Sequence, residues 1–324
     1  MHGFDPKWRD PEDYILGITK AIWEDRKIGS LTRYYGENLI VRSPASIVQG
    51  NAGIIAATMA TLAEFPDREL FGEDVIWADA SEAPGAFLSS HRLICTATHT
   101  HPGAYGAPTG RRLSYRILAD CYCADNAVHD EWLVRDQSAI VAQMGADIVD
   151  WTRDLIAREG GPEACVKPFT PAGDIAGPYR GAGNDHQHGA DLAGLLSRIM
   201  DADFAAIPAQ YDRACTLHYP GNQTAHGTKA ADAFWLGLRA AFPSATFQIH
   251  HHIGMNSPMM PPRAAVRWSL DGTHDGWGRF GTPTGAPVHI MGITHAEFGP
   301  WGLRREYTLI DETAIWKQIL LATG

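Results

Sequence analysis

Apolar and polar residues along this chain follow first a helical period and then a strand period. Residues 11–35 and 51–63 carry the helical pattern, and Phe65-Pro66 ends the second helix. Five strand-like runs accompany them, at 39–41, 74–78, 86–98, 112–123 and 128–134. A further helix is expected from residue 137. This order predicts an α+β domain in which helices pack on one face of a curved antiparallel sheet.

The same pattern occurs twice. Residues 98–110 and 273–285 each begin with Thr-His and end with Pro-Thr-Gly, and the matches continue on both sides with a single two-residue insertion. Two units of about 130 residues therefore match, which is longer than the ~20–50 residues of a solenoid repeat. We predict two tandem domains, 1–150 and 191–324, joined by a Gly- and Pro-rich linker over 151–190.

The second unit is expected to repeat the elements of the first. Its helices are predicted at 192–211, at 228–241 and from residue 312. Its strands are predicted at 246–253, 264–270, 288–297 and 305–309. In the first unit, Asp125-Asn126 predicts the tight turn between the last two strands.

Composition narrows the range of partners. The chain has 324 residues and a formal net charge of -10, with 45% hydrophobic and 20% charged residues, as is ordinary for a soluble globular protein. The acidic balance argues against nucleic acid or an anionic membrane, because both require a basic face. We find no signal peptide and no run of the ~18 apolar residues that a membrane span needs. Five cysteines without a Cys-x-x-Cys pair fit reduced thiols, so we predict a cytoplasmic protein.

Asp136 and Asp311 are matching carboxylates that follow the last strand of each unit. Asp136 shares a strand face with Trp132 and Val134, because alternate residues point the same way. If that face lies under the helices, burial raises the carboxyl pKa, which suits a general acid or base. The alternative is that each aspartate caps the helix that starts after it. The sequence leaves both roles open.

Arg92 and Arg267 occupy matching positions in the middle of a strand. A guanidinium at such a position can bind a carboxylate or enolate oxygen through two parallel hydrogen bonds. The alternative is an internal ion pair, with Glu131 in the first unit or Glu306 in the second. The two arginines are therefore candidates for substrate binding as well as for structural roles.

Two groups of histidines have a possible chemical role. His99 and His274 lie in the matching turns, where they can shuttle protons or hold the turn through hydrogen bonds. The run from His250 to His252 places at most two imidazoles on one strand face with no nearby carboxylate, which makes a weak metal site. No Gly-x-Gly-x-x-Gly, Gly-x-x-x-x-Gly-Lys or Gly-x-Ser-x-Gly motif supports nucleotide binding or serine hydrolysis. We expect neither a metal nor another cofactor.

Both halves share an ordered set of short motifs. In the first half these are Phe65-Pro66-Asp67, Ser90-His91-Arg92, Thr98-His99, Pro108-Thr109-Gly110 and Glu131-Trp132-x-x-x-Asp136. The second half repeats Phe242-Pro243, Arg267, Thr273-His274, Pro283-Thr284-Gly285 and Glu306-Tyr307-x-x-x-Asp311. Through these motifs each half resembles the SnoaL-like polyketide cyclase group of the nuclear-transport-factor-2-like superfamily.

That resemblance implies a cone-shaped α+β barrel around a mostly apolar pocket in each half. It also implies a cofactor-free intramolecular aldol closure, in which an aspartate takes and returns the proton while the pocket stabilises an enolate. Asp136 matches that aspartate, and Asp311 is its counterpart. The side chains expected to contact the substrate are Trp132, Tyr115, Tyr307, Asp120 and His295.

Two functions are open at this point. One is a cofactor-independent acid/base enzyme, a cyclase, isomerase or lyase that acts on a small or polycyclic, partly apolar carbonyl compound, with the first half as the more promising site. The other is a ligand-binding or scaffolding protein without chemistry. Domains of the resembled fold pair through the outer face of the sheet, so we expect an intrachain pseudo-dimer that uses residues 74–77 and the strand of Trp268. Further homo-oligomers are left open.

Overall fold

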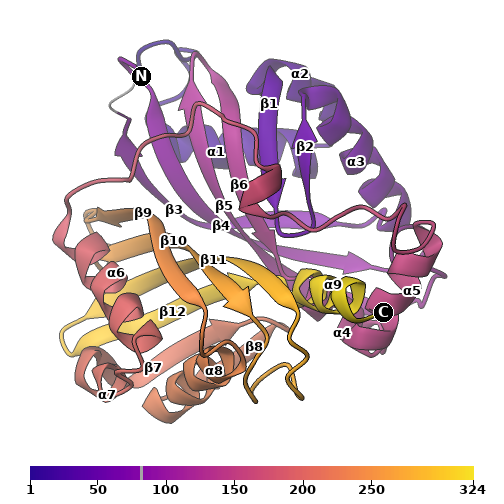
Figure 1. Ribbon diagram of the computed structural model, residues 1–324. Helices are drawn as coiled ribbons and strands as arrows, with labels where there is room; N and C mark the ends of the chain where they lie inside the picture. Colours follow the sequence, from indigo (N-terminus) through magenta and orange to yellow (C-terminus); the bar gives the residue numbers. More distant parts are fainter. Residues whose placement is uncertain (81–82) are drawn as a thin grey trace.

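The computed structural model describes residues 1–80 and 83–324. It contains two sheets of six strands, one in each half of the chain, each with its own helices (Figure 1). The prediction of two tandem α+β units is therefore confirmed. Within the described residues, no helix combines the length and the apolar character that a membrane crossing requires.

The first half starts with helices and then builds the first sheet. Its α-helices are α1 (Pro11–Thr19), α2 (Leu31–Tyr34), α3 (Asn51–Glu64), α4 (Gln137–Gln143) and α5 (Ile148–Arg158). A π-helical turn, η1 (Lys20–Glu24), and a 3-10 turn, η2 (Ile28–Ser30), lie between α1 and α2. Its strands are β1 (Tyr35–Ser43), β2 (Ser46–Gln49), β3 (Glu69–Asp79), β4 (Phe87–Thr98), β5 (Arg112–Ala124) and β6 (Ala127–Arg135).

The second half repeats this order after a connecting segment that contains the 3-10 turn η3 (Pro171–Gly173). Its helices are α6 (Gln187–Met200), α7 (Ala206–Gln210), α8 (Thr228–Ala241) and α9 (Glu312–Thr323). Its strands are β7 (Tyr211–Tyr219), β8 (Gln223–His226), β9 (Thr246–Met255), β10 (Arg263–Thr273), β11 (Pro287–Gly299) and β12 (Gly302–Ile310).

Each sheet is mixed and open. The strand orders are β2-β1-β6-β5-β4-β3 and β8-β7-β12-β11-β10-β9. The first strand of each half pairs in parallel with the last one, β1 with β6 and β7 with β12. The prediction of antiparallel sheets is wrong at this point, because the helix-containing connections return the chain beside its first strand. The sheets are curved layers rather than closed barrels.

The turn between β5 and β6 agrees with its sequence. Asp125 and Asn126 have φ values of 47° and 64°, and the flanking Ala124 and Ala127 pair across the hairpin. Asp and Asn tolerate this left-handed conformation, which a two-residue hairpin turn requires. The prediction of a tight turn at Asp125-Asn126 is confirmed, and it fixes the register of β6.

The two sheets meet across an interface between the halves. Ile76 and Leu88 of the first half form one apolar cluster with Ile253 and Ala265 of the second. A second cluster contains Leu118, Val134, Phe169, Met291, Ile293 and Leu309. The strand of residues 74–77 contributes Ile76 to the first cluster, and Asp74 accepts a hydrogen bond from Arg263 of the second half. Trp268 instead points into the core of the second half, so its strand contributes to the interface through other residues.

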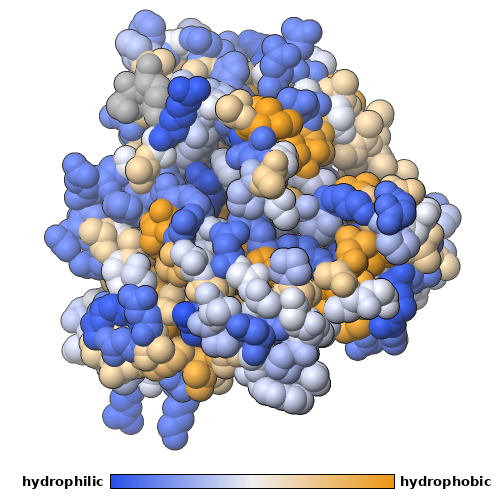
Figure 2. Space-filling view, viewed as in Figure 1, coloured by the Kyte–Doolittle hydropathy of each residue, from blue (hydrophilic) through white to orange (hydrophobic). Residues whose placement is uncertain are grey.

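The segment between α5 and α6 packs against both halves. Asp174 forms an ion pair with Arg42, and the hydroxyl of Tyr179 lies 3.0 Å from Nε2 of His251. Phe169 is buried in the second interface cluster. On the face shown in Figure 2, hydrophobic residues form separate patches among hydrophilic ones. The connection is thus part of the packed structure, and α5, which precedes it, is a helix that the sequence pattern did not predict.

Candidate functional site

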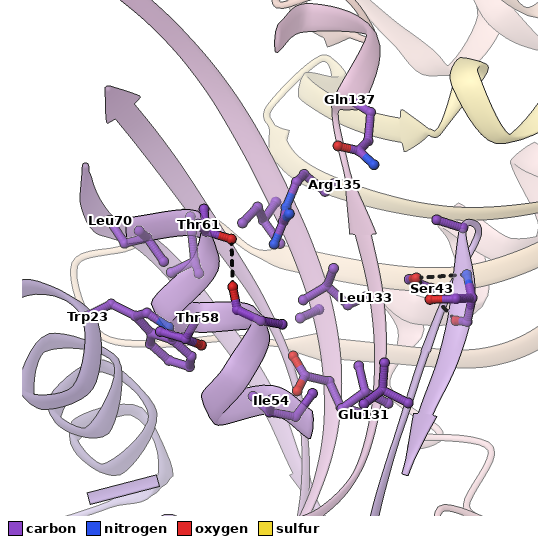
Figure 3. A pocket seen from close by; sticks show the side chains of 18 of the residues that line it. Trp23, Ser43, Ile54, Thr58, Thr61, Leu70, Glu131, Leu133, Arg135 and Gln137 are labelled. Atoms are coloured by element: carbon purple, nitrogen blue, oxygen red, sulfur yellow. Dashed lines mark hydrogen bonds between the residues drawn. The ribbon is translucent and has the colours of Figure 1, made fainter. Parts of the chain in front are cut away.

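The first half contains a cavity of about 280 Å³ between its sheet and α3. Figure 3 shows Glu131, Leu133, Arg135 and Gln137 in succession along the β6 side of this cavity. Alternate residues of β6 therefore face it. The rest of the wall is largely apolar and includes Trp23, Val41, Ile54, Leu70, Leu93 and Ile117. A mostly apolar cavity with a few polar groups is the usual form of a small-molecule site.

The second half carries large side chains at the corresponding places. The glycines that begin α3 and α8 align Thr58 with Trp235, and matching strand positions align Leu93 with Trp268. Both tryptophans are fully buried, with ring centroids 5.9 Å apart. The Trp268 ring also lies against Gly292, where a Cβ atom would clash with it. Aromatic rings thus occupy the space that is hollow in the first half.

Glu131 is one of two carboxyl groups that line the cavity. Its side chain is buried on the helix-facing side of β6. Burial raises the pKa of Glu131 to about 7, although the charge of Arg135 and a hydrogen bond from Tyr35 oppose this shift. A carboxyl group with such a pKa exchanges protons near neutral pH.

Asp311 is the second carboxyl group of the cavity, and it comes from the other half of the chain. It caps α9: Thr313 donates from its backbone N (3.0 Å) and from Oγ1 (2.7 Å), and Ala314 donates from its backbone N (3.4 Å). All three contacts use Oδ1, which leaves Oδ2 without a donor in the described part of the chain. Burial raises the pKa of Asp311 to about 7 against these hydrogen bonds. One oxygen is held by the helix, and the other is available to a ligand.

Asp136 caps α4 in the same way but has a different surrounding. Its Oδ1 accepts hydrogen bonds from Ser138 Oγ (2.8 Å) and from the backbone N of Ala139 (3.0 Å). From the second half, the backbone N of Gly221 donates to Oδ1 and that of Asn222 donates to Oδ2, each at 2.9 Å. Burial raises the pKa of Asp136, and these four donors lower it. Both of its oxygens are therefore occupied, and it lies outside the cavity lining.

The difference between the two aspartates originates in two hairpin turns. Asp136 meets the turn between β7 and β8, which has three residues, Pro220 to Asn222, and presents two free N–H groups. Asp311 and the turn between β1 and β2 line the same cavity, but this turn has only two residues, Pro44 and Ala45. Among the described residues, this shorter turn donates no hydrogen bond to Asp311, whose Oδ2 remains unpaired.

Further polar side chains line the cavity, among them His91, Gln137, Arg68 and Arg135. Burial lowers the pKa of His91 to about 4, so its imidazole is neutral. Gln137 accepts a hydrogen bond from the hydroxyl of Tyr105 at its Oε1, which directs its amide N–H groups elsewhere. Arg68 and Arg135 bring two positive charges to the same cavity.

Arg92 and Arg267 lie in the interface between the halves. The guanidinium of Arg92 stacks on the ring of Tyr307, 3.5 Å from its centroid, and that of Arg267 stacks on Trp132 at 4.1 Å. Each stack joins one half to the other. The ion pairs are also different from those predicted: Arg92 pairs with Glu73 (3.1 Å) and Arg267 with Asp120 (3.1 Å), in place of Glu131 and Glu306. These residues meet on the sheet faces that the two halves turn toward each other.

The remaining predicted substrate contacts also lie outside the cavity lining. Asp120 accepts a hydrogen bond from Ser90, whose Oγ lies 2.7 Å from Nε2 of His295 in the other half. Burial raises the pKa of Asp120, and Arg267 opposes this shift. Tyr115 is buried in the core of the first half, between the sheet and α4. The structure thus brings Trp132, Tyr307, Asp120 and His295 together as an interface cluster.

The histidines of the repeated turns hold their loops in place. Nδ1 of His99 lies 3.2 Å from Oγ1 of Thr109, and Nδ1 of His274 lies 3.1 Å from Oγ1 of Thr284. Both imidazoles are fully buried away from the cavity. In the run from 250 to 252, His251 contacts the connecting segment. Over the described residues, no group of three or more metal-binding side chains is arranged to hold an ion.

A second cavity of about 300 Å³ lies where the connecting segment covers the second sheet. Trp132 and Arg267 line it, together with Tyr179, His250 and His289. Arg180 lines it as well, and Arg267 is paired with the buried Asp120. The carboxyl group in its lining, Asp174, forms an ion pair with Arg42, so the first cavity is the better candidate for chemistry.

Sequence reasoning missed most of the groups that line the first cavity. Glu131 entered only as an ion-pair partner, and Arg68, Arg135 and Gln137 received no role. The signal was present in the alternation of residues 131, 133, 135 and 137, which is out of phase with Trp132 and Asp136.

Comparison with known families agrees with the resemblance seen in the sequence. Residues 193–303 match the family model of the SnoaL-like domain, which confirms the predicted resemblance for the second half. No curated protein matches the chain. Similar solved structures include AclR from Streptomyces galilaeus, with 20% identity, a TM-score of 0.35, and coverage of 40% of this chain and 79% of that one.

Two other solved structures are similar to a comparable part of the chain. IdmH from Streptomyces antibioticus has 19% identity and a TM-score of 0.36, with coverage of 41% of this chain and 97% of that one. A SnoaL-like polyketide cyclase from Agrobacterium tumefaciens has 19% identity and a TM-score of 0.31, with coverage of 40% and 94%.

Proposed function

We propose that this chain is a cofactor-independent acid/base enzyme that acts in the first-half cavity on a compact, mostly apolar carbonyl compound. The observation that carries the proposal is the unpaired Oδ2 of Asp311 at the wall of that cavity. In this proposal the halves work as an intrachain pseudo-dimer, because the first half forms the cavity and the second supplies the base. The SnoaL-like match of residues 193–303 supports a reaction of the cyclase or isomerase type.

The proposed reaction begins with removal of a proton from the carbon beside a carbonyl group. Asp311 accepts the proton, and the electron pair of the broken C–H bond moves onto the carbonyl oxygen to give an enolate. The amide of Gln137, oriented by Tyr105, donates to this oxygen. Return of the proton to another carbon gives isomerisation, whereas attack of the enolate carbon on a second carbonyl gives ring closure. Glu131, six residues from Gln137 along the chain, faces the other end of a bound molecule.

A chromogenic probe tests this proposal before the natural substrate is identified. A base that removes the ring C–H proton of nitrobenzisoxazole breaks its N–O bond and releases a coloured cyanonitrophenolate. We expect saturable turnover whose rate rises with pH and is half-maximal near pH 7, because only the ionised Asp311 accepts a proton and its pKa is raised to about 7. A rate no greater than that of free carboxylate would contradict the proposal. Probe binding without turnover would favour the non-catalytic ligand-binding protein instead.

Filling the cavity should abolish this turnover. The change Thr58→Trp introduces the side chain that occupies the matching position of the second half. The indole is expected to fill the cavity and reduce the elimination to the background rate, with the thermal midpoint of unfolding kept. Met59→Trp is the matched control, because Met59 is the next residue of α3 and is 53% exposed. Full turnover by the Thr58 variant would show that the reaction takes place elsewhere.

A further inference from the structure

The first-half cavity contains two arginines that have no acidic partner. Arg68 is 4% exposed, and it lines the cavity together with Arg135. Neither forms an ion pair with residues 1–80 or 83–324, and Nε of each is buried without a hydrogen-bond acceptor. A buried charge is costly unless it is paired, and buried donors in native structures are almost always satisfied. The missing acceptor is therefore to be sought in a ligand.

Arg68 and Arg135 line one cavity, and their charges also act on one thiol beside it. Cys95 lies outside the cavity lining and pairs across β4 and β5 with Tyr115. Burial raises the pKa of Cys95 to about 11, and the charges of Arg68 and Arg135 both oppose this shift. Each guanidinium group is a planar fork of donors that fits a planar anion, so two of them in one cavity can share one carboxylate.

None of the nearby carboxyl groups forms an ion pair with these arginines in the described part of the chain. Glu64 accepts hydrogen bonds from the backbone N of Ala104 (2.9 Å) and of Tyr105 (2.8 Å), and its Oε1 lies 3.2 Å from Nε2 of His99. Asp311 is held at the start of α9. Glu131 faces the cavity but forms no ion pair with either arginine among the described residues. The cavity thus has an excess of positive charge within an apolar wall.

We propose that Arg68 and Arg135 bind the carboxylate of a compact apolar organic acid inside the first-half cavity. A single planar carboxylate satisfies the two forks, while the apolar wall takes the remainder of the molecule. That the substrate of the enzyme is a carboxylic acid rests on the proposed function. That the cavity binds a carboxylate rests only on Arg68 and Arg135.

Calorimetric titration of the purified chain with naphthoate, naphthamide and inorganic phosphate tests the inference. We expect naphthoate to bind at least about tenfold more tightly than naphthamide, because a charge-assisted pair is replaced by a neutral contact. Inorganic phosphate should bind more weakly than naphthoate, because it has no apolar part. Equal affinity for acid and amide, no binding of either, or phosphate binding as tight as that of naphthoate would overturn the inference. These comparisons use the unaltered chain, so they do not depend on the folding of a variant.

Substitution of single residues then shows which side chains cause the preference for naphthoate over naphthamide. Arg68→Gln and Arg135→Gln should each lose most of the preference for naphthoate over naphthamide. Arg213→Gln, which removes an exposed charge on the second half, should keep it. A preference that survives both cavity variants would overturn the assignment.

The outcome separates this inference from the proposed function. Asp311→Asn should still bind naphthoate while losing the elimination of nitrobenzisoxazole. Naphthoate binding without any turnover by the unaltered chain would contradict only the proposed function. Turnover without a preference for the acid would contradict only the inference about Arg68 and Arg135.

Discussion

Asp311→Asn is expected to lower the elimination rate of nitrobenzisoxazole by at least about 100-fold, within the range that a positioned general base contributes. The amide keeps the acceptor oxygen that caps α9 but cannot take up a proton. Because Asn is as good a helix cap as Asp, the free energy of unfolding should change by less than about 1 kcal/mol. Initial rates at saturating probe, with unfolding measured on the same samples, check both expectations.

The control for this result is the second carboxyl group of the cavity. Glu131→Gln removes a group with a similar pKa from the middle of β6, and it should keep the elimination rate within about tenfold, because the probe needs a base and no acid. The reverse pattern, with the Asp311 variant active and the Glu131 variant inactive, would move the base to Glu131. Equal activity in both variants would remove the carboxyl groups of the cavity from the mechanism.

Asp136→Ala is expected to destabilise the protein by about 3 kcal/mol. The change removes the cap of α4 and also leaves the N–H groups of Gly221 and Asn222 without their acceptors. Buried donors that lose their partner cost more than an exposed cap does. Urea unfolding at neutral pH measures the loss.

Asp147→Ala is the matched control for this stability effect. Asp147 caps α5 through the backbone N of Val149 (2.9 Å) and of Asp150 (3.0 Å), at an exposed site within one half. Its loss should cost about 1 kcal/mol. If the two variants were equally stable, the contact of Asp136 with the second half would contribute nothing. The Asp136 variant should retain elimination activity per folded molecule, because Asp136 lies outside the cavity.

The repeat and its elements could be predicted from local sequence because local interactions determine them. Matching Gly- and Pro-rich turns showed the two units, and Asp125-Asn126 fixed the hairpin of β5 and β6. The mixed pairing of β1 with β6 could not be predicted in this way, because it depends on where a long connection returns the chain.

The alternation along β6 follows from the sequence, but which of its two faces the helices cover does not. Trp132 and Asp136 do share a face, and that face meets the other half of the chain. Period-two patterning identifies two faces without saying which one the helices cover. Because the two units pack against each other, both faces of β6 are buried. An apolar pattern therefore does not tell which face the helices cover. Glu131 was therefore considered only as an ion-pair partner, and Arg135 was given no role.

The different environments of the two aspartates depend on contacts distant in sequence. Asp136 meets Gly221, and Asp311 lines a cavity together with Pro44. These contacts join residues of different halves, 85 positions apart for Asp136 and Gly221, and the two hairpin turns differ in length by one residue. The sequence alignment showed two equivalent aspartates, whereas the structure makes one a buried structural cap and the other a candidate base.

Titration of Asp311 itself tests the central claim most directly. In protein that carries isotope-labelled aspartate, the side-chain carboxyl resonance of Asp311 is assigned by NMR through its loss in Asp311→Asn. We predict that it titrates with a pKa near 7 and that its chemical shift changes when naphthoate occupies the cavity. A pKa near 3.8 with no response to the ligand would contradict the claim that Asp311 faces the cavity as a base.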